Sequence, residues 1–97
     1  MRLRLTPDAQ RDINDIFVYG VLTYGLAASD RYSSGLQDAI DRLAVYPMLG
    51  TAHDDITPPV RLLRHDSHHI LYAIRDSELL VLRVLHGSVD WLSQLSR

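Results

Sequence analysis

The side chains able to do chemistry gather in the second half of the chain. They are arginines and histidines, namely Arg61, Arg64, His65, His68, His69, Arg83 and His86. Histidine together with arginine supports general acid–base cleavage of a phosphodiester, because arginine stabilises the negative charge that develops. One hypothesis is therefore that this half of the chain holds a nuclease site.

Structural roles are the competing explanation for most of these side chains. Histidines at strand ends usually cap backbone groups or pair with a carboxylate. His68 and His69 are neighbours, so in a strand they point to opposite faces and do not bind one metal ion together. The chain has no cysteine, no serine-nucleophile motif and no phosphate-binding glycine loop. We therefore expect no metal, no cofactor and no assigned catalytic residue.

Arg83 lies inside the most apolar segment, Leu79 to Leu85, which is typical of a well-buried strand. A charged residue there costs free energy unless it is paired or faces an open surface. Strand alternation divides the segment into two faces. Leu80, Leu82 and Val84 are expected to meet the helices, whereas Leu79, Val81, Arg83 and Leu85 are expected on the opposite, partly open face.

This open face leads to two hypotheses about its residues. An exposed apolar patch made of Leu79, Val81 and Leu85 would mark a partner surface. Arg83 would then meet carboxylates of the partner. Alternatively, Arg83 pairs within the chain, with Asp76, Asp90 or the chain terminus.

The elements that must position these residues follow from periodicity and punctuation. Thr6-Pro7-Asp8 is a helix start, and Gly25 and Pro47 end the two helices. Turns at Asp66-Ser67 and Asp76-Ser77 predict a meander of antiparallel hairpins. The predicted elements are a strand through Leu3 and Leu5, a helix from Pro7 to Tyr24, a second helix with a stripe from Ala28 to Leu43, a loop from Met48 to Pro59, strands at Val60–His65, His68–Arg75 and Leu79–His86, and a last turn at Val89–Leu95.

This order, β-α-α-β-β-β, predicts an α+β fold in which a helical hairpin packs on one face of the sheet. At 97 residues the chain is expected to be one domain, residues 1–97. Its formal charge of −2 argues against a surface built wholly to bind phosphates. No apolar stretch approaches the roughly 20 residues of a membrane span, so we expect a cytoplasmic protein.

Several short motifs, taken in order, resemble a known family over almost the whole length. They are Leu5-Thr6-Pro7-Asp8-Ala9, Asp12-Ile13 with Ile16, Tyr24-Gly25, Ala28, Tyr32, Leu36, Ala39-Ile40, Leu43-Ala44, Pro47, Gly50, Arg61, Ser67-His68, Ile70, Tyr72, and Arg83-Val84-Leu85-His86 with Asp90. In these positions the chain resembles ParE-type toxins of bacterial type II toxin–antitoxin systems, in the RelE/ParE superfamily. Val60 departs from the pattern, because a glycine often precedes the family's counterpart of Arg61.

The resemblance implies a toxin that arrests growth and is neutralised by a ParD-like antitoxin encoded by an adjacent gene. The antitoxin wraps the toxin and binds operator DNA, so the toxin meets DNA only indirectly. ParE members poison DNA gyrase, whereas RelE members cut mRNA on the ribosome. The absence of lysine, the acidic net charge and the lack of a tyrosine after Tyr72 favour gyrase binding without catalysis.

The open face of the last strand and the resemblance together give the candidate site residues. For partner binding they are Arg61, Leu79, Val81, Arg83, Leu85 and His86. For the alternative, a ribosome-dependent endoribonuclease, they are Arg61, Arg83 and His86. His86 keeps this alternative open, because some nuclease members have histidine at the matching position.

Overall fold

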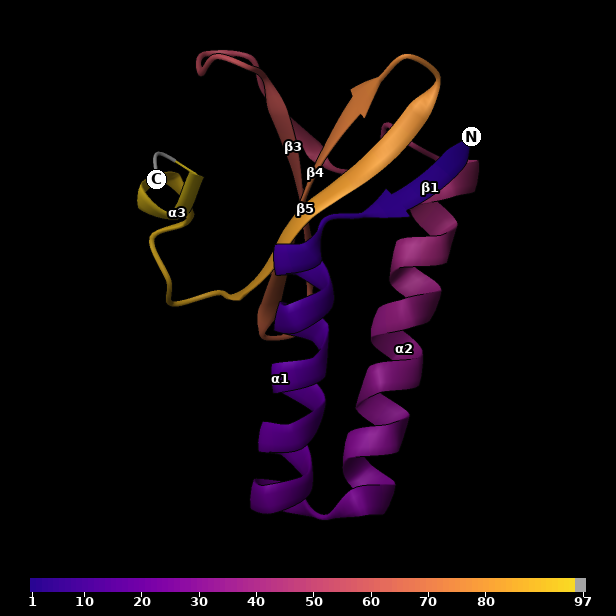
Figure 1. Ribbon diagram of the computed structural model, residues 1–97, viewed down its shortest axis with the longest axis vertical. Helices are drawn as coiled ribbons and strands as arrows, with labels where there is room; N and C mark the ends of the chain where they lie inside the picture. Colours follow the sequence, from indigo (N-terminus) through magenta and orange to yellow (C-terminus); the bar gives the residue numbers. More distant parts are fainter. Residues whose placement is uncertain (96–97) are drawn as a thin grey trace.

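The protein, as a computed structural model that describes residues 1–95, is a helical hairpin packed on one five-stranded sheet (Figure 1). Its elements are β1 (Arg2–Leu5), α1 (Pro7–Tyr24), α2 (Leu26–Val45), β2 (Thr51–His53), β3 (Val60–His65), β4 (His68–Arg75), β5 (Glu78–His86) and α3 (Trp91–Leu95). The predicted α+β class and the predicted order of elements are confirmed, with one additional strand.

The sheet is mixed, with the strand order β1-β5-β4-β3-β2. Strands β2 to β5 pair in antiparallel fashion, whereas β1 runs parallel to β5 and pairs with its first half, Glu78 to Val81. Two-residue turns join β3 to β4 and β4 to β5. Asp66, Asp76 and Ser77 adopt positive φ there, as tight hairpin turns require.

The helices begin and end at the predicted signals. The Thr6 hydroxyl accepts a hydrogen bond from the Ala9 backbone N–H at 3.0 Å, which caps α1. Gly25, at φ 94°, is the only residue between the two helices, so they run antiparallel. In Figure 1 the hairpin covers one face of the sheet and extends well beyond it.

Strand β2 corrects the expectation that Met48 to Pro59 is entirely loop. Thr51, Ala52 and His53 carry no apolar alternation, so nothing in their pattern indicates a strand. They pair with Val60 to Leu62 of β3 at the edge of the sheet. This strand forms because a neighbouring strand offers its backbone groups, which sequence periodicity does not reveal.

The sheet buries apolar side chains on both of its faces. Toward the helices lies the main core, whose largest fully buried members are Tyr72, Leu36, Ile40, Leu43, Ile70, Leu79 and Val81. On the other face a smaller cluster is centred on Val60, Leu71 and Leu85. Val89, Trp91 and Leu95, in and before α3, pack against it, so the C-terminal segment covers this second face.

A β-bulge overturns the predicted faces of β5. Tyr72 pairs with Val81 and Leu71 pairs with Arg83, so Leu82 is left without an opposite residue. The extra residue shifts the alternation by one position. As a result Leu79, Val81 and Val84 all face the helices, and Leu79 and Val81 are fully buried. The predicted exposed patch of Leu79, Val81 and Leu85 is therefore wrong, since Leu85 is also buried.

Candidate functional site

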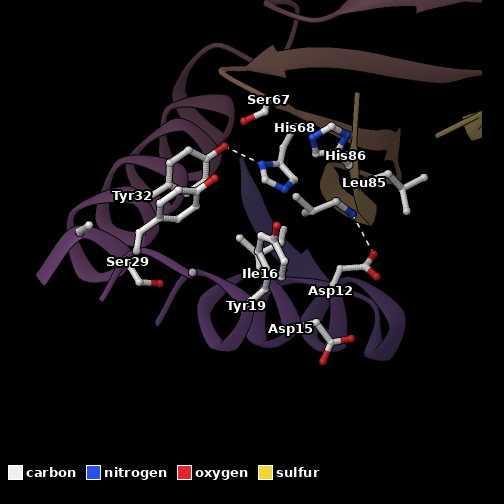
Figure 2. A pocket seen from close by; sticks show the side chains of 14 residues that line it. Asp12, Asp15, Ile16, Tyr19, Ser29, Tyr32, Ser67, His68, Leu85 and His86 are labelled. Atoms are coloured by element: carbon white, nitrogen blue, oxygen red, sulfur yellow. Dashed lines mark hydrogen bonds between the residues drawn. The ribbon is translucent and has the colours of Figure 1, made fainter. Parts of the chain in front are cut away.

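A groove of about 700 Å³ lies between the helical hairpin and the end of β5 (Figure 2). Its walls are mostly apolar and aromatic, with a few polar side chains among them. The lining residues are Asp12, Asp15, Ile16, Tyr19, Gly20 and Tyr24 of α1, Ala28, Ser29 and Tyr32 of α2, Ser67 and His68 at the start of β4, and Val84, Leu85 and His86 of β5. Concave apolar sites with convergent polar groups are the usual form of a binding site.

The groove exists because β1 is shorter than β5. After Leu5 the chain turns into α1, so the second half of β5 has no strand beside it on that edge. Side chains of the first helix satisfy the backbone instead. The Thr6 hydroxyl donates to the Leu82 carbonyl at 2.7 Å, and the Asp12 carboxylate accepts from the Val84 N–H at 3.0 Å. Backbone groups that lack a strand partner are thereby satisfied.

Arg83 forms a bidentate ion pair with Asp12. Its Nε donates to Oδ2 at 2.7 Å and its Nη2 donates to Oδ1 at 3.0 Å. The hydrogen bond to Asp12 is also the main cause that raises the pKa of Arg83 above its ordinary value. The expected partners Asp76 and Asp90 are therefore wrong for Arg83, and the third expected partner, the chain terminus, lies outside the described residues. Its guanidinium ties β5 to α1 and does not stand free on an open face.

Tyr32, His68 and His86 meet at the sheet side of the groove (Figure 2). The Tyr32 hydroxyl hydrogen-bonds His68 Nδ1 at 2.5 Å, and the rings of His68 and His86 lie edge to face with centroids 5.6 Å apart. Burial, followed by the nearby His86, lowers the pKa of His68. His68 is therefore neutral near pH 7. The Ser88 N–H donates to His86 Nδ1, which leaves the proton of neutral His86 on Nε2.

Arg61 does not line the groove. It pairs with Tyr72 across β3 and β4, whereas His86 pairs with His68. Along β4 the two positions are therefore four residue steps apart, about 13 Å at roughly 3.3 Å per residue. The Arg61 Nη2 donates to the Met48 carbonyl at 3.2 Å, near the C-terminal end of α2. The three nuclease candidates Arg61, Arg83 and His86 are thus not brought together.

The remaining candidates divide between core and groove. Leu79 and Val81 belong to the main core, and Leu85 and His86 line the groove. Sequence reasoning missed Asp12, Ile16, Tyr19 and Tyr32 as site residues. A signal was present on α1, because Asp12, Ile16 and Tyr19 recur at helical spacing and form one mixed polar and aromatic stripe.

Two further observations concern the part of the chain that the structure describes. Within residues 1–95, no three histidine, aspartate or glutamate side chains are grouped so that they could hold a metal ion. In the same range no helix is both long and apolar enough to cross a membrane.

Fold and groove together define the class of protein: a small α+β fold with an apolar-walled groove between its helical hairpin and its sheet. The same fold occurs in a chain of the chromosomal ParDE TA system from P. aeruginosa, with a TM-score of 0.78. That match covers 89% of this chain and 95% of the other, at 19% identity.

The sequence comparisons identify the family. The family model described as the ParE toxin of the type II toxin–antitoxin system parDE matches residues 3–91. Toxin ParE1 of Mycobacterium tuberculosis is 36% identical, over 92% of each chain. Toxin ParE of Escherichia coli is 29% identical, over 95% of this chain and 90% of its own. The chain belongs to the ParE toxin family of type II toxin–antitoxin systems, and the family resemblance noted from the sequence is confirmed.

Proposed function

We propose that this chain arrests growth by binding and inhibiting DNA gyrase, and that a ParD-like antitoxin from an adjacent gene neutralises it. The family membership supports the toxin role and a ParD-type partner. The observation that favours binding over catalysis is that the three nuclease candidates lie apart. Arg61 lies near the start of β3, whereas His86 is the last residue of β5. The guanidinium of Arg83 is already paired with the Asp12 carboxylate. Neither of these two arginines is therefore free beside His86 to stabilise charge on a phosphate.

The groove is the antitoxin site in this proposal. An amphipathic segment laid into such a groove buries its apolar side chains against Ile16, Tyr19 and Val84. Asp15 at the groove wall suits a basic side chain of that segment. The groove continues onto the exposed part of the hairpin, where Tyr19 and Tyr24 line it, so a long segment finds more apolar surface there.

Two assays on antitoxin-free protein test the proposed target. The chain should inhibit supercoiling by purified gyrase and should leave mRNA on programmed ribosomes intact. Co-expression with the adjacent gene should yield a complex that no longer inhibits gyrase. A chain that cuts ribosome-bound mRNA and does not inhibit gyrase would refute the proposed target. Failure to co-purify with the adjacent gene product would refute the proposed antitoxin partner.

One observation favours a second candidate, a ribosome-dependent endoribonuclease. The structure brings Tyr32, His68 and His86 together at the open groove, and neutral histidine beside a phenol is able to transfer protons. In that case His68→Ala and His86→Ala should each abolish cleavage of ribosome-bound mRNA while the protein stays folded. The proposed function predicts that neither change affects gyrase inhibition by more than about twofold.

A further inference from the structure

The C-terminal end of α2 carries a second apolar surface, away from the groove. Four exposed apolar residues lie close together in the sequence here, namely Val45, Tyr46, Met48 and Leu49. Their exposed fractions range from 49% for Leu49 to 68% for Val45. Met1 lies beside them, because its backbone nitrogen donates to the Ala44 carbonyl at 3.0 Å. We call these five residues the α2–β2 corner. In Figure 1 the C-terminal end of α2 and the hairpin turn lie at opposite ends of the molecule.

The backbone of the corner is fixed, although its side chains are exposed. The Tyr72 hydroxyl, inside the core, donates to the Pro47 carbonyl at 2.7 Å and accepts from the Gly50 N–H at 2.8 Å. A Cβ on Gly50 would come within 2.6 Å of that oxygen, so only glycine allows this approach. The Leu49 N–H donates to the Tyr46 carbonyl. The exposed side chains therefore stand on a rigid support, as binding residues do.

Arginines lie around the corner, although the whole chain has a net charge of −2. Arg42 occupies the last turn of α2, and Arg61 donates to the Met48 carbonyl. On the neighbouring strand β1, Arg2 and Arg4 share the single carboxylate of Glu78, each at 3.6 Å. The nearest other acid on α2, Asp41, accepts a hydrogen bond from Gln37. Among these six charged side chains, four are therefore arginines and two are acids.

From these observations we infer that the α2–β2 corner is the surface that binds the toxin's target, and that the target presents an apolar pocket with an acidic rim. The inference rests on the proposed function, which makes this target DNA gyrase. Tyrosine and methionine anchors ringed by arginine are the composition typical of such contacts. The groove, whose wall carries Asp15, fits a segment with a basic side chain and is a separate site.

Gyrase affinity of purified variants tests this assignment. Tyr46→Ala combined with Leu49→Ala removes two exposed anchors and leaves every backbone hydrogen bond of the corner in place. Arg42→Glu reverses one rim charge. The matched control is Leu22→Ala combined with Leu26→Ala, two exposed apolar residues at the other end of the hairpin. Affinity for gyrase, growth arrest, antitoxin affinity and the melting temperature are measured for each.

We expect both corner variants to lose at least tenfold in gyrase affinity and to arrest growth poorly, with unchanged melting and antitoxin affinity within twofold. The control should bind gyrase like the wild type. If the wild type binds gyrase and the corner variants bind equally well, the assignment is wrong and the proposed function stands. If the wild type itself does not bind gyrase, the proposed function is wrong. The assignment of the corner as a gyrase-binding surface is then wrong as well.

Discussion

Asp12 shows how one side chain holds two elements together. Its carboxylate accepts three hydrogen bonds, two from the Arg83 guanidinium and one from the Val84 N–H. Both partners of the ion pair are largely buried, with 22% of the Arg83 side chain and 14% of the Asp12 side chain exposed. Removing one partner of such a pair leaves the other desolvated and unpaired.

Asp12→Ala should therefore destabilise the protein more than Arg83→Ala. We expect a loss of about 2 to 3 kcal/mol for Asp12→Ala, since a guanidinium and a backbone N–H both lose their acceptor. Arg83→Ala should cost about 1 to 2 kcal/mol, because the carboxylate keeps the Val84 N–H. Urea unfolding of both variants and of the double variant measures this. Equal losses, or a double variant whose loss is the sum of the two, would contradict the coupling.

His68 should make stability depend on pH. Burial and the neighbouring His86 lower its pKa in the folded chain. The unfolded chain therefore binds more protons once the pH falls below about 6.5, so the free energy of unfolding should decrease as the pH falls through that value. His68→Gln should flatten this decrease, although His69, whose pKa burial also lowers, will leave part of it. Unfolding curves from about pH 7.5 to 5.5 test the effect. The same slope in wild type and variant would exclude His68 as its source.

At the scale of elements, the spacing of α1 and α2 depends on Gly20. A Cβ at this position would lie 2.4 Å from the Ser29 hydroxyl oxygen and 3.0 Å from its Cβ. Ser29 is buried, and its hydroxyl donates to the Phe17 carbonyl at 2.8 Å, so it has little freedom to move. The hairpin therefore needs a glycine here even though glycine weakens a helix.

Gly20→Ala should destabilise the hairpin by about 1 to 3 kcal/mol, through the clash between the helices. Gly35→Ala is the control within α2. Its Cβ would lie at ordinary contact distance, 3.7 Å from the His65 ring, so this change should stabilise the protein by up to about 1 kcal/mol. Thermal melting of the two variants measures these changes in stability. A stabilised Gly20→Ala variant would mean that the helices are able to separate without cost.

At the scale of the whole molecule, one core unites the hairpin and the sheet. Leu36 is 1% exposed and packs in this core, whereas Leu22, on the part of the hairpin that extends beyond the sheet, is 81% exposed. Leu36→Asp should unfold the domain, because it buries a carboxylate without a partner. Leu22→Asp should leave the domain folded. Circular dichroism and growth arrest are the measurements, and a cooperatively melting Leu36→Asp variant would mean that the hairpin is not anchored where the structure has it.

The sequence by itself determined the family and every element except β2. Thr6-Pro7, Gly25 and Pro47 bound the helices, and the strands Val60–His65 and His68–Arg75 fall where alternation and turn residues predict them. These features depend on local backbone chemistry, which neighbouring residues decide. Short residue motifs, in their order and spacing, were enough to recognise the ParE family, which the match over residues 3–91 confirms.

Only the tertiary structure decided which side chains meet. Every position of β5 from Leu79 to Leu85 except Arg83 is apolar, so the sequence pattern does not indicate which face is buried. The bulge at Leu82 in addition shifts the alternation by one position. The pairing of Arg83 with Asp12, 71 residues earlier, depends on the place where β1 ends beside β5. The groove and the α2–β2 corner have the same origin: they are made by elements far apart in the chain, and packing, which no local pattern encodes, brings these elements together.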